Sequence, residues 1–464
     1  MIQNLSKITS QFQLVKLIKI TSTWYDHLTS KMALTVRQVV CLGRKEVPRA
    51  AYCIVQIRQK SNVTLQNYKR GTGGRSSFSG TVATVFGASG FLGKKVVNQL
   101  GAIGCQVVIP RRGDFYELDQ LKLAGDLGQI LYHDYDLKDE DSIKRAMAYS
   151  NVVINCIGRN WETKNYSFDE VHVEGARRIA RAAKEMGVEK LIHISSLNAS
   201  PNPQAVLKRD GSDFLKSKYD GELAVREEFP EAVIIRPADM FGGNDTFIDL
   251  YVNPWRRRMG YKIPLWHKGE STIKQPVYVS DVAKGIMNAI KMQKADGQTY
   301  EAVGPTRYYL SDLVDYFWNC CRYPTVPGRV RLRSWSRFRL RAEFNEKFKF
   351  LFHGAPPYTW DKLERDHLTD RTTGCLLLED LNVQLTPIER VAPYQLKPHI
   401  MGSYYAEKLH EYADPAPPVP TEFTPEPKGI AYTFPEVVTG LLRSSIAFEV
   451  SACVVAYYVY MTYF

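Results

Sequence analysis

Long apolar runs and metal-binding patterns are both missing from most of this sequence of 464 residues. Between Met1 and Pro435 no stretch of about 18 residues is both apolar and uncharged, which excludes a membrane protein with several spans. The eight cysteines include no Cys-x-x-Cys pair and no histidines at zinc-binding spacing, so we predict free thiols and no metal site. Hydrophobic residues make up 44% of the chain, enough for a folded core, which excludes disorder throughout.

Acidic residues are nearly absent from residues 1–75, where 13 Lys and Arg accompany only Asp26 and Glu46. The remaining chain has 48 basic and 47 acidic residues, so the net charge of +12 comes almost wholly from this leader. A nearly neutral body has no general electrostatic reason to bind nucleic acid, and we expect no such partner. The composition of the leader is typical of a mitochondrial transit peptide, and the alternative is a basic extension without a targeting role.

The other end of the chain, residues 401–464, combines a Pro-rich linker with an apolar tail. Six prolines fall between Pro415 and Pro427, which predicts an extended segment without a packed core. The tail over 446–464 has Glu449 as its only charge and is of borderline length for a membrane span. We favour a packed or partner-facing tail over a spanning one.

A strand, a glycine turn and a helix are predicted over residues 81–103. Three glycines follow the strand over 81–86 directly, and apolar residues then recur at helical spacing. Small residues let the backbone approach a pyrophosphate, whose charge then lies at the helix N-terminus. The turn therefore predicts a dinucleotide site, because the triplet has the correct elements before and after it. Its expected residues are Gly87, Ser89, Gly90, Phe91, Leu92 and Gly93.

The second predicted strand, 106–110, ends in Arg111 and Arg112. An NAD-binding protein of this kind has an acidic residue near this point, which holds the ribose 2′-hydroxyl. Two guanidiniums instead suit a 2′-phosphate through charge-assisted hydrogen bonds. We therefore predict NADP(H), and the alternative is a pair of solvated surface arginines.

Strands and helices continue to alternate along the chain, which predicts an α/β fold with a Rossmann-type doubly wound parallel sheet. The further strands are expected at 129–135, 151–156, 190–195 and 232–235. We place the nucleotide-binding domain at 76–240, with 276–305 returning to it, and a smaller irregular C-terminal cap domain at 241–400. The ligand belongs at the strand C-termini. There the candidate residues are Asp136 and Leu137 beside an adenine, then Cys156, Ile157, Gly158, Ser195, Ser196 and Pro237.

Together these residues resemble the extended or atypical short-chain dehydrogenase/reductase family over roughly residues 80–310. The resemblance rests on GASGFLG at 87–93, HISS at 193–196, IIRPADMFG at 234–242, VYVSDVAKGI at 277–286 and YEAVGP at 300–305. In active members of that family a Ser or Thr and a Tyr-x-x-x-Lys helix carry out the chemistry.

At that position this sequence has Phe214 and Lys218, so the lysine is present and the phenol is missing. Phenylalanine has no proton to exchange, which removes the central group of general acid–base catalysis. Tyr219 does not replace it, because adjacent helical residues point about 100° apart. We therefore predict no catalytic residue, with Ser196 and Lys218 as remnants that contact the cofactor.

Within this family the chain looks most like the accessory subunits of mitochondrial respiratory complex I. The basic leader, the lost tyrosine beside a retained lysine, and YTWDKLERDHLTD at 358–370 support this resemblance. It implies a non-catalytic subunit with tightly held NADPH, docked against other complex I subunits on the matrix side of the inner membrane, near the junction of the two arms. The alternatives are an active mitochondrial NADP-dependent reductase or epimerase, and a nucleotide-sensing or RNA-associated relative.

The segment from Arg329 to Arg341 holds six arginines interleaved with Trp335 and Phe338. Three interpretations compete for it. It contacts anionic inner-membrane lipid, or it binds RNA through stacking, or it is a solvated face paired with acidic residues, which we favour.

Overall fold

The computed structural model describes residues 70–113, 118–208, 210–252, 262–322, 328–331, 359–400 and 415–421. Most of the predicted leader and the apolar tail over 446–464 lie outside the described residues. In the part of the chain that is described, no helix is both long and apolar enough to cross a bilayer.

An eight-stranded sheet forms the centre of the fold, in the order β3-β2-β1-β4-β5-β6-β11-β14, and every neighbouring pair is parallel. The strands are β1 (Val82–Phe86), β2 (Gln106–Arg111), β3 (Ile130–Asp134), β4 (Val152–Asn155), β5 (Lys190–Ile194), β6 (Val233–Pro237), β11 (Thr299–Ala302) and β14 (Leu376–Leu377). The central strands are buried runs of Val and Ile, as expected when helices cover both faces of a parallel sheet. The predicted doubly wound sheet is confirmed.

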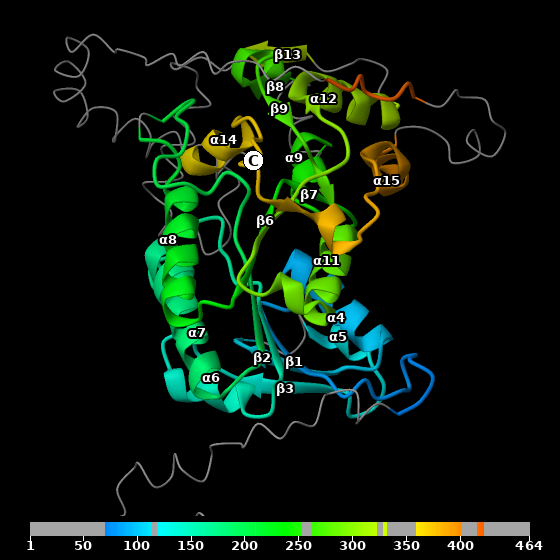
Figure 1. The fold of residues 1–464 in the computed structure, drawn as a ribbon. Helices are drawn as coiled ribbons and strands as arrows, with labels where there is room; N and C mark the ends of the chain where they lie inside the picture. Colours follow the sequence, from blue (N-terminus) through cyan, green and yellow to red (C-terminus); the bar gives the residue numbers. More distant parts are fainter. Residues whose placement is uncertain are drawn as a thin grey trace, which may run out of the picture. The chain divides into compact units, whose positions relative to one another are not determined.

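Helices cover the two faces of this sheet in separate layers (Figure 1). On one face lie α4 (Phe91–Ala102) and α11 (Val279–Lys291), and the short α5 (Asp119–Lys122) packs beside α4. On the other face lie α6 (Glu140–Met147), α7 (Gly175–Glu185) and α8 (Asp213–Glu228), with the π-helical turn η3 (Glu170–Glu174) leading into α7. Alanines on the buried side of α7 let it approach the sheet closely.

The order of connections reverses between β1 and β4, because the chain runs outward from β1 to β3 and then returns to start the other half at β4. A reversal of this kind leaves a crevice at the C-terminal ends of the two strands, where ligands bind in open α/β sheets. The glycine turn after β1 opens directly onto this crevice.

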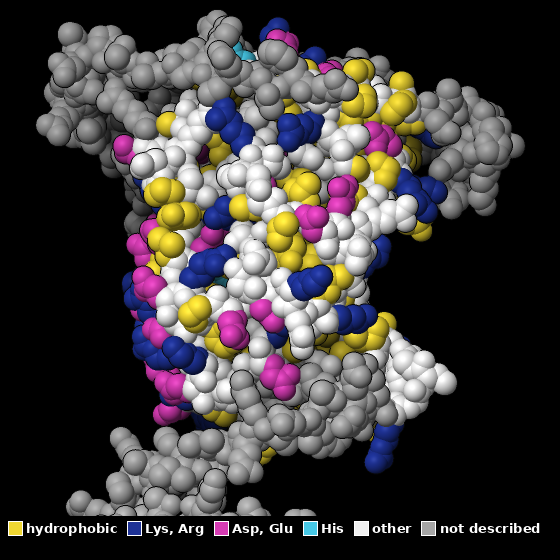
Figure 2. Space-filling view, viewed as in Figure 1, with side chains coloured by type: hydrophobic (Ala, Val, Ile, Leu, Met, Phe, Trp, Pro, Cys, Tyr) yellow, Lys and Arg dark blue, Asp and Glu magenta, His cyan; other side chains and the backbone are white. Residues whose placement is uncertain are grey.

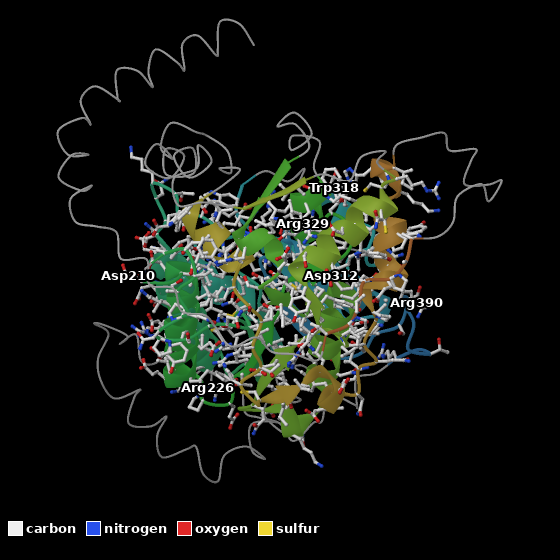
Figure 3. The ribbon with its side chains drawn as sticks, turned by 90° about the horizontal axis from the view of Figure 1, so that it is seen from above. Asp210, Arg226, Asp312, Trp318, Arg329 and Arg390 are labelled. Carbon is white, nitrogen blue, oxygen red and sulfur yellow. The ribbon has the colours of Figure 1, made fainter. Side chains whose placement is uncertain are left out.

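A second hydrophobic cluster lies outside the sheet layers. It is built from α9 (Phe247–Val252), β8 (Lys262–Leu265), α12 (Leu310–Cys320) and α15 (Ile388–Gln395). Trp318 on α12 is fully buried there and donates a hydrogen bond to the carbonyl of Tyr251, 3.1 Å away. Figure 3 shows Trp318 well away from Arg226 on α8.

Short elements connect this cluster to the sheet. They are β7 (Met240–Phe241), η4 (Trp266–Gly269), β9 (Ile273–Lys274), β10 (Val277–Tyr278), η5 (Gln293–Ala295), β12 (Tyr308–Tyr309), β13 (Gly328–Arg331), α14 (Trp360–Asp366), η6 (Leu378–Leu381) and η7 (Lys397–His399). Strands β7 and β10 pair in parallel, as do β8 and β13, while β9 and β12 are antiparallel.

The expectation that 241–400, apart from the return over 276–305, forms a separate cap is wrong for β14, which extends the main sheet beside β11. The buried carboxylate of Glu301 on β11 accepts hydrogen bonds from the backbone N–H and the hydroxyl of Thr373, which hold the incoming chain against the sheet edge. Leu378 then packs over Gly285 on α11, where an added Cβ would lie 2.6 Å from it. The strand β14 therefore joins the sheet because of tertiary contacts, and not because its own sequence has a strand pattern.

Charged side chains of both signs gather over the helices α6, α7 and α8 (Figure 2). Arg181 on α7 pairs with Glu228 on α8 at 2.8 Å and with Glu140 on α6 at 3.5 Å. Exposed pairs of this kind contribute little stability individually. They show that this face is balanced in charge, in agreement with the nearly neutral body.

Candidate functional site

The glycine turn has the backbone geometry that a pyrophosphate site requires. Gly87 has φ +77°, and a Cβ there would lie 2.8 Å from the carbonyl oxygen of Cys156. A Cβ on Gly93 would lie 2.3 Å from the carbonyl oxygen of Gly87. Gly90 is the N-cap of α4, and the first turn of this helix carries no acidic residue. The positive end of the helix dipole is therefore available to an anion.

The two arginines at the end of β2 have different surroundings. The Nε of Arg111 pairs with the carboxylate of Asp134 on β3, 2.7 Å away. The guanidinium of Arg112 instead lies over the ring of Tyr166, 4.8 Å from its centre. Arg111 is thus engaged along the sheet edge, and Arg112 is held above the loop that follows β4.

Asp136 and Leu137, expected beside an adenine, point in different directions. An oxygen of Asp136 accepts hydrogen bonds from the backbone N–H of Lys138 at 3.0 Å and from the hydroxyl of Tyr166 at 3.1 Å. These bonds, the one from Lys138 first, lower the pKa of Asp136 below its usual value. The side chain of Leu137 is buried against α7, where it lies close to Gly175, and its carbonyl oxygen accepts a hydrogen bond from Arg178 on α7 at 3.2 Å.

Lys218 lies buried between the ends of β4 and β5. Its Nζ donates hydrogen bonds to the carbonyl oxygens of Ile194 at 3.1 Å and Ile157 at 3.4 Å, and a Cβ on Gly158 would lie 3.2 Å from it. Burial lowers the pKa of Lys218 to about 8. Burial also raises the pKa of the Cys156 thiol to about 12, against the opposing effect of Lys218. The thiol is therefore neutral at physiological pH.

The two serines after β5 differ in exposure. Ser195 is buried, and its hydroxyl has no hydrogen-bond partner among the described residues. Ser196 is partly exposed and lines the cavity described below, as does Pro237 at the end of β6. A buried hydroxyl without a partner is costly, and a bound ligand would satisfy it.

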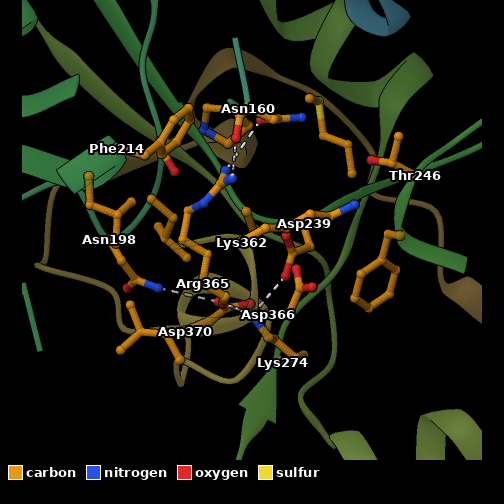
Figure 4. A pocket seen from close by; sticks show the side chains of 18 of the residues that line it. Asn160, Asn198, Phe214, Asp239, Thr246, Lys274, Lys362, Arg365, Asp366 and Asp370 are labelled. Carbon is orange, nitrogen blue, oxygen red and sulfur yellow. Dashed lines mark hydrogen bonds and ion pairs between the residues drawn. The ribbon is translucent and has the colours of Figure 1, made fainter. Parts of the chain in front are cut away.

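Phe214, the residue in place of the expected tyrosine, is covered by the C-terminal part of the chain. Its ring packs edge-on against His172, with 5.1 Å between ring centres. The guanidinium of Arg365 on α14 lies 4.0 Å from the centre of the Phe214 ring. Arg365 also donates hydrogen bonds to the side-chain oxygen and the carbonyl oxygen of Asn160, each 3.2 Å away (Figure 4).

Helix α14 is fastened to the loop that precedes α8. The carboxylate of Glu364 accepts hydrogen bonds from three consecutive backbone N–H groups, those of Val206, Leu207 and Lys208. Asp361 accepts from the hydroxyl of Ser212 at 3.0 Å. The sequence predicted no site residue on this helix, although the resemblance of residues 358–370 had singled out the segment.

A cavity of about 210 Å³ lies between the strand ends and α14. At its edge Lys274 is fully buried and pairs with Asp239 at 2.8 Å and with Asp370 at 3.6 Å (Figure 4). Burial alone would lower the pKa of Lys274, but these carboxylates raise it above its ordinary value. On the side of the strands the cavity is lined by Phe91, Ser195, Ser196 and Pro237. Helix α14 lines it with Lys362, Arg365 and Asp366.

The arrangement can hold a dinucleotide along the strand ends, but Phe214 offers no proton at the position that acid–base chemistry would use. Among the described residues, no group of three or more His, Cys, Asp or Glu is placed to hold a metal ion. Arg329 of the Arg-rich segment pairs with Asp315 at 3.1 Å, and residues 332–341 lie outside the described residues.

Comparison with known proteins identifies close relatives of this chain. The NAD dependent epimerase/dehydratase family matches residues 83–302. The mouse protein named NADH dehydrogenase [ubiquinone] 1 alpha subcomplex subunit 9, mitochondrial, is 45% identical over 388 residues, which cover 82% of this chain and 98% of the mouse protein. The Arabidopsis thaliana protein of the same name is 36% identical, over 77% of this chain and 86% of that protein. Among solved structures, the UDP-glucose 4-epimerase of Thermotoga maritima is similar with a TM-score of 0.48 and 16% identity, over 71% of this chain and 99% of that one.

Proposed function

This chain belongs to the family of NADH dehydrogenase [ubiquinone] 1 alpha subcomplex subunit 9 proteins, and from that premise we propose that it is a non-catalytic accessory subunit of mitochondrial respiratory complex I. In this proposal it binds NADPH tightly and stabilises the assembly on the matrix side of the inner membrane, near the junction of the matrix and membrane arms. Its partners are the other subunits of the complex.

The observation that carries the proposal is the extent of the relationship. The alignment covers 82% of this chain and 98% of the mouse subunit, so it extends well beyond the nucleotide fold over 83–302. A match to the nucleotide fold alone would suit any reductase of the wider family. The extension of the match beyond the nucleotide fold favours the subunit over the alternative of an active mitochondrial reductase.

Two features of the site support the absence of catalysis. Phe214 has no proton to exchange, and Arg365 lies over the face of its ring. Arg365 and its partner Asn160 line the cavity beside Phe214, so a substrate carbonyl that entered there would meet a guanidinium rather than a phenol. The alternative of an active reductase therefore requires a different acid.

The nucleotide in this proposal lies along the strand ends, with its pyrophosphate at the N-terminus of α4. Arg112 supports NADPH, because a guanidinium stands where an NAD-binding protein has an acid. The residues that we propose to contact it are Gly87, Ser89, Gly90, Phe91, Leu92, Gly93, Arg111, Arg112, Asp136, Leu137, Cys156, Ile157, Gly158, Ser195, Ser196, Lys218 and Pro237. Contact between Arg329–Arg341 and anionic lipid stays a prediction, and the ion pair from Arg329 to Asp315 favours the solvated alternative for that one residue.

The test is native-gel migration of the tagged, imported full-length chain, followed by release and identification of the nucleotide from the purified band. We expect co-migration with complex I and about one NADPH per chain. A small free species that turns over NADPH with a carbonyl compound would contradict the proposal and support the reductase.

A further inference from the structure

The loop between β4 and η3 carries an aromatic ring, that of Tyr166, which two cations approach. The ring of Tyr166 has the Arg112 guanidinium 4.8 Å from its centre and the Lys138 ammonium 4.9 Å from its centre. Cations over an aromatic face are attracted to the negative potential of the ring. Neither cation is adjacent to Tyr166 in the sequence, so the fold brings the three together.

Tyr166 is itself fixed in place. Its ring packs against the core cluster beneath α7, and its hydroxyl donates a hydrogen bond to Asp136 at 3.1 Å. Its carbonyl oxygen accepts the backbone N–H of Thr163 at 3.0 Å, which closes the local turn. A ring anchored at its edge and its hydroxyl is a rigid support for a flexible arginine.

On this rim Lys138 pairs with Glu170 at 3.3 Å. The carboxylate of Asp136 that accepts the Tyr166 hydroxyl interacts electrostatically with Arg112 without forming an ion pair with it. No acidic group within the described ranges lies within ion-pair distance of Arg112 or of Arg159, the second arginine of the rim, whose guanidinium lies over Trp161. Burial, and after it the charge of Arg112, lowers the pKa of Arg159. The two guanidiniums are therefore close enough to repel one another electrostatically. Two neighbouring guanidiniums that form no ion pair with a described carboxylate favour an anion of more than one charge.

We propose that Tyr166 is a positioning residue for nucleotide specificity, whose ring holds Arg112 at the end of β2 for contact with the 2′-phosphate of NADPH. The inference rests on the proposed function, because it needs the nucleotide along the strand ends. It assigns different roles to the adjacent arginines. Arg111 on β2 forms an ion pair with Asp134 on β3, and Arg112, held over Tyr166, binds the 2′-phosphate.

The test compares the affinities of the purified full-length chain for NADPH and NADH, measured by the fluorescence of the reduced nicotinamide. In Tyr166→Ala we expect the Kd for NADPH to rise by about 3- to 30-fold, as for the loss of one cation–π contact, and the Kd for NADH to change by less than about twofold. Tyr166→Phe keeps the ring and should keep most of the preference. Tyr149→Ala, which removes an exposed tyrosine at the end of α6, is the matched control and should change neither Kd.

A double-mutant cycle separates positioning from direct contact. In an Arg112→Ala background, Tyr166→Ala should weaken NADPH by less than about a further twofold, because the residue that it positions is gone. An unchanged effect in that background, or an equal loss of NADPH and NADH, would overturn the inference and leave the proposed function standing. A wild-type chain that binds neither nucleotide would overturn the proposed function and the inference with it.

Discussion

The guanidinium of Arg365 lies 4.0 Å from the centre of the Phe214 ring, and Arg365 is held there by two hydrogen bonds to Asn160. This contact joins helix α14 to Phe214 on α8, the position at which the sequence resemblance predicts a missing phenol. In the proposed non-catalytic role the Phe214 ring has no proton to exchange, and the cation of Arg365 covers its face.

Replacing Phe214 by tyrosine should not restore hydride transfer. The new phenol would lie in the cavity beside Arg365 and Asn160, where the cation of Arg365 rather than a hydride acceptor faces the ring. The measurement is loss of NADPH absorbance with a panel of carbonyl compounds, and we expect no turnover above wild type. Phe168→Tyr, which adds a hydroxyl to the neighbouring ring, is the control. Turnover in Phe214→Tyr alone would show that the phenol was the single missing group.

Gly90→Val should release the nucleotide while the fold survives. A Cβ at Gly90 meets only the carbonyl oxygen of Gly87, at 3.1 Å, whereas the larger side chain would fill the place of the pyrophosphate. Nucleotide content after purification, with melting temperature alongside, measures the effect. Gly74→Val is the control, because nothing lies within 4 Å of a Cβ there. Equal nucleotide content in Gly90→Val and wild type would contradict the site assignment.

Glu364→Gln should lower the free energy of unfolding by about 1–3 kcal/mol, the cost of leaving buried hydrogen-bonding groups unsatisfied. Glu364 is fully buried and accepts from three backbone N–H groups, whereas a neutral amide has only one acceptor oxygen. Denaturant titration gives the difference. Glu379→Gln on η6 changes an exposed carboxylate in the same way and should stay within about 0.5 kcal/mol of wild type. Matching losses in the two variants would show that α14 is not fastened by Glu364.

His193 should make the chain less stable in acid. Burial, and after it the charge of Lys218, lowers the pKa of His193 to about 3, while the unfolded chain takes up this proton near pH 6.5. Between these values the unfolded state binds the extra proton, so stability falls as pH falls. Wild type should lose about 2 kcal/mol more than His193→Gln between pH 7 and pH 5. His133→Gln, at an exposed position, should behave as wild type, and a parallel pH dependence in His193→Gln would refute the assignment.

The sequence by itself determined the local architecture of the nucleotide fold. The strand, glycine turn and helix over 81–103 and the later strands form as predicted, because apolar spacing and small residues act on neighbouring parts of the chain. The alternation of these elements was enough to predict the parallel sheet and the crevice at its strand ends. Phe214 and Lys218 were identified by the resemblance to the Tyr-x-x-x-Lys helix of the wider family.

Only the tertiary structure decided which side chains meet at that crevice. It distinguished Arg112 from Arg111, turned the side chain of Leu137 into the core, and added β14 to the sheet. It also brought Arg365 onto Phe214. Local spacing did not predict these contacts, because each partner comes from an element distant in sequence and is positioned by the packing of the whole fold.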